Sequence, residues 1–328
     1  MRKLRTFFFA LAVTVGFSVS AFGQSSPLPG FPPGVFQNHA VYDPPPSGSS
    51  YQGPGDVVSG ATAWGSCARA YSSSVASGTS MCDLVDSAAP TTVICTLQTG
   101  SNGKVNLTGT YCTGGVTPAT KCAAATGGLC NISKIYDQAG STGGFIQATV
   151  GNQAQLTFSA LNALPGIKCT SAAATNLNTA GSVTLPQPFS LSTVAERTAN
   201  FTTQGTWLGA LSNSLLFGPS PQANVWLAGD PSGALTGNAP ATDSAFHAAQ
   251  GVYPTSGGTI TMSVDGSSST HTAGSGGVTT ALRFCRQNGQ LSPDGIEMEG
   301  GFWPIAFSGT QITNLNANQH GSANGYNF

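Results

Sequence analysis

Acidic residues gather beside an aromatic residue late in the chain, in a pattern suited to acid–base chemistry. Three of the twelve Asp and Glu residues lie within six positions, at Asp294, Glu297 and Glu299, and Trp303 follows them. Because side chains two apart on a strand point to the same face, Glu297 and Glu299 could lie side by side. Two carboxyl groups about 5 to 5.5 Å apart, one protonated and one ionised, can cleave a glycosidic bond with retention of the configuration at the anomeric carbon. A wider separation suits cleavage with inversion of that configuration. The pattern predicts Asp294, Glu297 and Glu299 as catalytic candidates, and Trp303 as a substrate-binding residue that stacks on a sugar ring.

The same segment also has a purely structural interpretation. Glu297 and Glu299 alternate with Ile296 and Met298, as in any strand that buries one face and exposes the other. On this interpretation the two carboxylates only line the solvent face of an edge strand. The alternation by itself favours this interpretation over catalysis.

The elements that must position these residues are short strands. Segments rich in β-branched and aromatic residues, separated by Gly, Asn and Pro, predict strands over 91–98, 132–137, 155–158, 189–196, 206–211, 224–228, 279–286 and 295–307. Residues 259–264 alternate apolar and hydroxyl side chains before Asp265-Gly266, which predicts a hairpin that returns through 267–272. Apolar residues at helical spacing predict a short helix from Trp64 to Val75, and a closing helical turn is expected over 310–318. Many short strands without long helices predict an all-β protein, a two-sheet β-sandwich with one or two short helices.

The start of the chain has the features of an export signal. Three basic residues among the first five precede an apolar run from Phe7 to about Val19, and Ala21 and Gly23 fit a cleavage site. That run is too short for a mature membrane span. Residues 1–23 are therefore predicted to be a signal peptide, and the protein to be secreted to the periplasm or outside the cell. Residues 24–52 are predicted to be a flexible leader rich in Pro, Gly and Ser, and residues 53–328 a single β-sandwich domain.

Charge and motifs exclude several classes of partner. Without its first 23 residues the chain keeps eight basic and twelve acidic residues, a net charge of −4. Nucleic acid is excluded as a partner because phosphate binding needs a basic surface. No later stretch is long and apolar enough for a membrane span. The sequence contains neither a Walker loop nor a Gly-x-Ser-x-Gly elbow, and no cofactor is expected.

The cysteines predict disulfides. All eight follow the predicted signal peptide, and an even number in an oxidising compartment indicates pairing, with at least three disulfides expected. The shortest loops that could close are Cys122–Cys130 and Cys82–Cys95. A zinc site needs closer cysteine pairs, and the four histidines are far apart in the sequence, so no metal is expected.

Several segments together resemble the catalytic domain of α-L-arabinofuranosidase B, glycoside hydrolase family 54. The segment 64–76, WGSCARAYSSSVA, is similar to the opening of that domain, and 130–149, CNISKIYDQAGSTGGFIQAT, resembles its strand, Tyr-Asp-Gln turn and following Gln. The hairpin at Asp265-Gly266 and the strand that ends at 305–309 look like concanavalin-type sandwiches in general. The resemblance covers most of residues 60–310. It implies a concanavalin A-like jelly roll and a polysaccharide or other glycan partner that bears arabinose, while Asp137 and Gln138 themselves are suited to holding a turn.

The chain departs from this family at both catalytic positions. The family nucleophile is a Glu on a central strand, but no Asp or Glu occurs from Arg197 to Gly229. At the acid/base loop the chain has Arg-Gln-Asn-Gly at 286–289, and the nearest carboxylate is Asp294. The adjacent Cys-Cys pair of the family is also absent.

Two classes of function stay open. One is a secreted glycoside hydrolase that removes arabinofuranosyl side chains from plant-type polysaccharide, with Asp294, Glu297 or Glu299 replacing the family's acids. The other is a non-catalytic, lectin-like or surface-attachment β-sandwich that has lost the catalytic carboxylates. The fold cannot separate them, because the same sandwich carries hydrolases and lectins.

Overall fold

The computed structural model describes residues 51–140, 142–199, 205–210, 216–220, 225–229, 235–240, 244–272, 276–286, 292–321 and 324–328. The predicted signal peptide and almost all of the predicted leader lie outside these residues. Tyr51 is buried, and its hydroxyl donates a hydrogen bond to the carbonyl of Ala70. The Gln52 amide donates to the side chain of Asn324 at 3.1 Å. The folded part therefore includes Tyr51 and Gln52, which corrects the expected boundary at residue 53.

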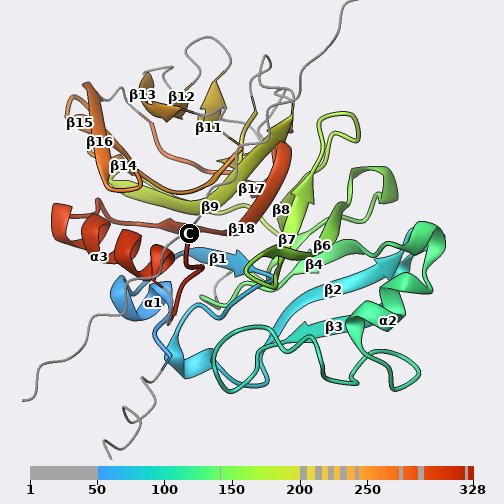
Figure 1. Ribbon diagram of the computed structural model, residues 1–328. Helices are drawn as coiled ribbons and strands as arrows, with labels where there is room; N and C mark the ends of the chain where they lie inside the picture. The colour runs from blue at the N-terminus through green and yellow to red at the C-terminus, as the bar shows by residue number, and fades with distance from the viewer. Residues whose placement is uncertain are drawn as a thin grey trace, which may run out of the picture. The chain divides into compact units, whose positions relative to one another are not determined.

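The described residues form many short strands and three short α-helices (Figure 1). The strands are β1 Ala63–Ser66, β2 Ser80–Asp86, β3 Ala89–Gln98, β4 Asn131–Ile135, β5 Phe145–Ile146, β6 Ala154–Leu161, β7 Leu164–Cys169, β8 Leu177–Thr179, β9 Phe189–Ala199, β10 Leu208–Ala210, β11 Leu216–Ser220, β12 Val225–Gly229, β13 Leu235–Pro240, β14 Phe246–Tyr253, β15 Thr259–Val264, β16 Ser267–Thr272, β17 Leu282–Phe284 and β18 Asp294–Trp303. The α-helices are α1 Pro54–Val57, α2 Pro118–Ala123 and α3 Gly309–His320, and single 3-10 turns cover Ser73–Val75, Thr126–Gly128 and Val150–Asn152. The all-β prediction is confirmed.

Antiparallel pairing joins these strands into two layers. One layer runs β16–β15–β14–β9–β18, and the other edge of β18 pairs with β7 and then with β1. The second series runs β3–β2–β4–β5–β8–β17–β10–β11–β12–β13. Strand β6 pairs with both β7 and β4 and so connects the layers. Figure 1 shows β11 to β13 over one side of β14, β9 and β18, and α1 and α3 on the other side.

Aromatic contacts fill the space between the layers. Trp207 and Trp226 are buried, and their rings stack with centroids 6.5 Å apart. The Trp226 ring also meets His247 of β14 edge-on. Each large side chain that is fully buried stabilises the fold by roughly 1.5–3 kcal/mol. These contacts hold β10 and β12 against the sheet that contains β18.

The described residues contain four disulfides, which confirms the prediction of at least three. They are Cys67–Cys82, Cys95–Cys112, Cys122–Cys130 and Cys169–Cys285. The sequence left the connectivity open. Of the two short loops it allows, Cys122–Cys130 is closed, whereas Cys82 and Cys95 pair with other cysteines. In the β2–β3 register Cys82 lies opposite Leu97, and Cys95 lies opposite Leu84. The two sulfurs are therefore not cross-strand neighbours, and each finds a partner elsewhere.

The local predictions were met at the C-terminal elements but not near the start. Strands β15 and β16 form the expected hairpin around Asp265-Gly266, and the closing helical turn is the three-turn helix α3. The helix expected from Trp64 to Val75 is wrong. There the chain forms β1, whose Trp64 pairs with Gly301 of β18, and later a single 3-10 turn. Pairing with a buried strand satisfies the backbone groups of this segment, so the helical spacing of its apolar residues has no effect.

Candidate functional site

A β-bulge in β18 separates the two glutamates that the sequence places together. Glu297 pairs with Ala195 of β9, but Glu299 pairs with Val194, and the register shifts between them. Since consecutive residues of β9 point to opposite faces, the paired glutamates point to opposite faces too. The expectation that Glu297 and Glu299 share one groove is therefore wrong. One extra residue in the strand is the physical reason.

Glu299 faces the helix side, where its carboxylate is enclosed by hydrogen-bond donors. Arg69 donates to both oxygens, Nε to Oε2 at 2.6 Å and Nη2 to Oε1 at 2.9 Å. Gln319 of α3 donates to Oε1 at 2.8 Å, and the Tyr326 hydroxyl donates to Oε2 at 2.9 Å. Burial works against the charge of Arg69, but the Glu299 carboxylate raises the pKa of that guanidinium above its usual value. Glu299 is 1 % exposed, so its oxygens serve this network rather than a surface groove.

Glu297 lies on the opposite face, between the layers. It is fully buried, and its Oε1 accepts a hydrogen bond from Thr193 Oγ1 at 2.9 Å. Its Oε2 has no hydrogen-bond partner within the described part of the chain. Burial raises the pKa of Glu297 well above its ordinary value, and the Thr193 hydrogen bond and the backbone amide of Cys285 oppose this only in part. Burial thus favours the protonated form of this carboxyl group more than water does.

Trp207 packs against the backbone of β18 at Gly295. Gly295 is two residues before Glu297 on the same face, and a Cβ atom there would lie 2.6 Å from the Trp207 ring. Only glycine allows the indole to approach this closely. The indole nitrogen of Trp207 is buried and has no hydrogen-bond partner within the described segments. The face of β18 that points between the layers thus holds one buried carboxyl group, and an aromatic ring packs against the strand two residues away.

Asp294 and Trp303 lie at the two ends of β18 and do not meet. They are nine positions apart along the strand, which corresponds to roughly 30 Å. The Asp294 carboxylate accepts hydrogen bonds from the backbone amide and hydroxyl of Ser171, at 2.8 and 2.6 Å. Trp303 is fully buried, donates from Nε1 to the carbonyl of Val58 at 2.9 Å and packs edge-on against Phe307. The Trp303 ring therefore presents no face to a ligand in this structure.

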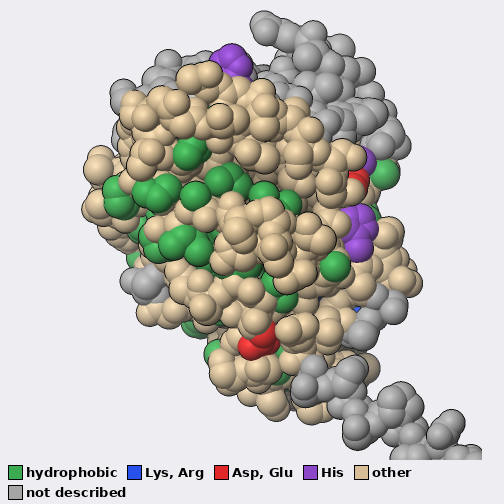
Figure 2. All heavy atoms as spheres, turned by 90° about the vertical axis from the view of Figure 1, so that its left-hand side faces the viewer, with side chains coloured by type: hydrophobic (Ala, Val, Ile, Leu, Met, Phe, Trp, Pro, Cys, Tyr) green, Lys and Arg blue, Asp and Glu red, His purple; other side chains and the backbone are tan. Residues whose placement is uncertain are grey.

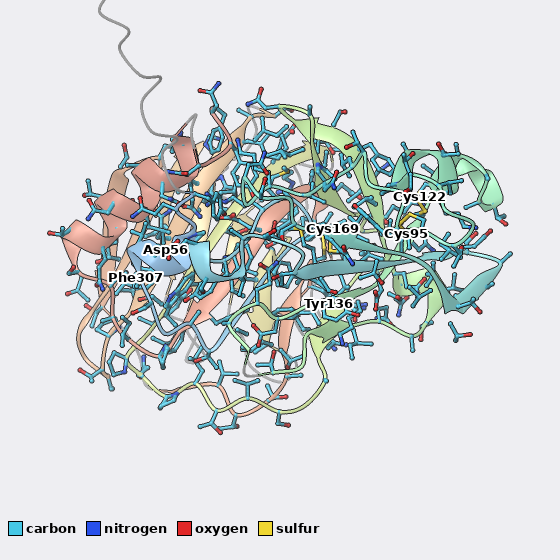
Figure 3. All side chains as sticks on the ribbon, turned by 90° about the horizontal axis from the view of Figure 1, so that it is seen from below. Asp56, Cys95, Cys122, Tyr136, Cys169 and Phe307 are labelled. Atoms are coloured by element: carbon cyan, nitrogen blue, oxygen red, sulfur yellow. A yellow bond between two sulfur atoms is a disulfide. The ribbon has the colours of Figure 1, made fainter. Side chains whose placement is uncertain are left out.

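Asp137 and Gln138 have the structural role that was expected of them. The Asp137 carboxylate accepts from the backbone amides of Trp64, Ala139 and Thr142. The Gln138 side chain accepts from the Tyr71 amide at 3.0 Å. These contacts fasten the turn after β4 to the start of the folded chain. Figure 3 labels the neighbouring Tyr136 at this turn.

Sequence reasoning missed Arg69, Thr193, Gln319 and Tyr326 as partners of the two glutamates. Arg69 carried a signal, since it stands among small and apolar residues in the segment 63–71. A charge inside a buried segment requires a buried partner of opposite charge. The other three are common polar residues without a distinguishing spacing.

One group of side chains has the spacing of a metal site but not its chemistry. The sulfurs of Cys169 and Cys285 and a carboxyl oxygen of Glu297 lie within 4.8 Å of one another. The two sulfurs are bonded to each other, whereas a zinc site uses thiolates, so this group does not fit zinc.

No helix in the described part of the chain is long and apolar enough to cross a membrane.

No protein-family model matches the chain, and no curated protein matches it in sequence. Solved structures do match. An arabinofuranosidase complexed with arabinofuranosyl-α-1,2-xylobiose is similar over 81 % of this chain, with 16 % identity and a TM-score of 0.53. A variant of a glycoside hydrolase family 54 α-L-arabinofuranosidase soaked with 4-nitrophenyl α-L-arabinofuranoside is similar over the same share, with 17 % identity and a TM-score of 0.54. The fold is that of these arabinofuranosidases. The chain spans 64 % of the length of each, and at this identity the likeness establishes the fold alone.

Proposed function

We propose that the protein acts outside the cytoplasm as a carbohydrate-binding β-sandwich, that its ligand class is glycan bearing arabinofuranosyl groups, and that it does not hydrolyse this glycan. The arabinofuranosidase fold over most of the chain supports the ligand class. Four disulfides and the export-like start of the sequence support the location. Charged residues make up only 7 % of the chain, which fits a neutral ligand.

The observation that carries the proposal is the bulge between Glu297 and Glu299. Hydrolysis of a glycoside by the usual route needs two carboxyl groups that face the same bound sugar. The bulge turns the two glutamates of β18 to opposite faces, and Arg69 occupies both oxygens of Glu299. Asp294, the third candidate, holds the loop at Ser171. The acids of β18 thus support the fold rather than hydrolysis. We therefore favour sugar binding without cleavage as the function of this β-sandwich.

A hydrolase is the second candidate, favoured by Glu297 alone. Its raised pKa suits a proton donor, and Trp207 packs against the same strand two residues away, at Gly295. Such an enzyme needs a second carboxyl group on the same face, and Asp294 is the nearest one on the strand.

The two candidates are separated by incubating the purified protein with 4-nitrophenyl α-L-arabinofuranoside and with an array of plant glycans. We expect no release of 4-nitrophenol above background, and we expect the protein to bind the arabinofuranosyl glycans on the array. Glu297→Gln should leave glycan binding to the array unchanged, as should the control Asp86→Asn at the end of β2. Release of 4-nitrophenol that Glu297→Gln abolishes and Asp86→Asn preserves would overturn the proposal in favour of the hydrolase.

A further inference from the structure

An open pocket lies between α1 and α3, on the helix side of β18 and away from Glu297. Its volume is about 580 Å³, within the range of small-molecule sites. It is lined by Gln52, Asp56, Val57, Asn314, Ala317, Asn318, Gly321 and Asn324. Figure 3 shows the labelled Asp56 on α1 beside α3. Asn314, Ala317 and Asn318 recur every three or four residues and so lie on one face of α3, and Gly321 follows directly after its last residue.

Amide side chains dominate the lining. Gln52 and Asn314 are exposed, and no hydrogen bond to either side chain occurs among the described residues. Each offers one acceptor oxygen and two donor hydrogens. Asp56 is the one charged residue in the described lining, and its carboxylate accepts from Gly53 and from the amide and hydroxyl of Ser73. A wall of amides with no cation suits a neutral ligand whose groups both donate and accept hydrogen bonds.

The inner wall of the pocket is fixed by the Glu299–Arg69 ion pair. Arg69 Nη1 donates to Asn318 Oδ1 at 3.0 Å and to the carbonyl of Asn324 at 2.9 Å. Asn318 Nδ2 in turn donates to the carbonyl of Gln52 at 2.8 Å. The guanidinium itself is fully buried behind these residues. Three segments far apart in the sequence are thereby held in place before any ligand arrives, which lowers the entropy cost of binding.

We propose that this pocket binds a short neutral oligosaccharide through hydrogen bonds from Gln52 and Asn314 to sugar hydroxyls, while Asn318 holds the inner wall. The amide lining indicates that the ligand is neutral and carries many hydroxyl groups. That its sugar is arabinofuranosyl rests on the proposed function. Figure 2 shows the face that carries α3 with few acidic or basic side chains in view. No aromatic ring lines the described pocket, so ring stacking does not contribute, and we expect weak binding with a Kd on the order of 1 mM.

Calorimetric titration with α-1,5-linked arabinotriose tests the pocket, with Asn314→Ala as the variant and Thr310→Ala as the control. Both residues are exposed on α3, but Thr310 is not part of the pocket lining. Loss of one or two hydrogen bonds should weaken binding about three- to tenfold in Asn314→Ala, and Gln52→Ala should have a similar effect. Thr310→Ala should stay within about twofold of the wild type, with all melting temperatures alike.

The outcomes distinguish this inference from the proposed function. Arabinotriose binding that neither Asn314→Ala nor Gln52→Ala weakens would overturn the pocket and leave the function standing. Suppose instead that xylobiose binds, arabinotriose does not, and Asn314→Ala weakens the binding of xylobiose. The pocket then stands, and the arabinofuranosyl ligand class is overturned. If neither sugar binds, both the pocket and the proposed function are overturned.

Discussion

Glu297 and Glu299 are two positions apart on β18 and both are buried, yet their carboxyl groups have different partners. Glu299 is ion-paired with Arg69 and accepts four hydrogen bonds, whereas Glu297 has one hydrogen bond and a pKa raised by burial. A strand with acids could be predicted from their alternation with Ile296 and Met298. The bulge could not, because it depends on the register against β9. Nor could the Arg69 pairing, which joins residues 230 positions apart.

The buried carboxyl of Glu297 should make stability depend on pH. Its folded pKa lies well above the unfolded value near 4.5, so above that pH the unfolded chain releases a proton that the folded protein keeps. The free energy of unfolding therefore falls as pH rises through this window, by up to about 1.4 kcal/mol per pH unit for this one group. Glu297→Gln removes the effect. We expect the stability of the wild type relative to Glu297→Gln to fall between pH 4 and pH 8, measured by urea denaturation. A constant difference across that range would show that Glu297 titrates normally.

Elements that depend on nearby residues, such as turn and capping residues, could be predicted from the sequence. Elements that depend on strand pairing between distant segments could not. The alternation over Thr259–Val264 and the Asp265-Gly266 turn are sufficient for the β15–β16 hairpin, and Ser308 and Gln311 cap α3 reciprocally. The Trp64 segment has helical spacing, but its pairing with β18 decides its conformation. Disulfide partners follow the same rule, since the β2–β3 register places Cys82 away from Cys95.

The hairpin turn offers a matched pair of glycine substitutions. Gly266 has a φ of +83°, in the left-handed region, whereas Gly151 has no positive φ, and a Cβ atom at either would meet nothing within 4 Å. Because space is equal, only backbone strain differs. Gly266→Ala should lower the free energy of unfolding by about 1–2 kcal/mol, and Gly151→Ala should leave it within about 0.5 kcal/mol. Equal melting temperatures for the two variants would contradict the backbone conformation of this turn.

In the molecule as a whole, one disulfide connects parts of the chain that are distant in sequence. Cys169–Cys285 spans 116 residues and Cys122–Cys130 spans eight. On the chain-entropy model, replacing both cysteines of the long loop by alanine should cost about 5 kcal/mol, and of the short loop about 2–3 kcal/mol. Urea denaturation of the two double variants checks the order. A larger loss for Cys122→Ala with Cys130→Ala would mean that native-state packing, rather than chain constraint, sets the effect.

The central proposal is that this sandwich binds arabinofuranosyl glycan and leaves it intact. Its most direct test is a calorimetric titration of the purified protein with arabinofuranosyl-α-1,2-xylobiose, after which the sugar in the cell is examined by mass spectrometry. We predict a saturable heat of binding and recovery of the whole trisaccharide. Free arabinose and xylobiose in the cell, or the absence of saturable heat, would contradict it.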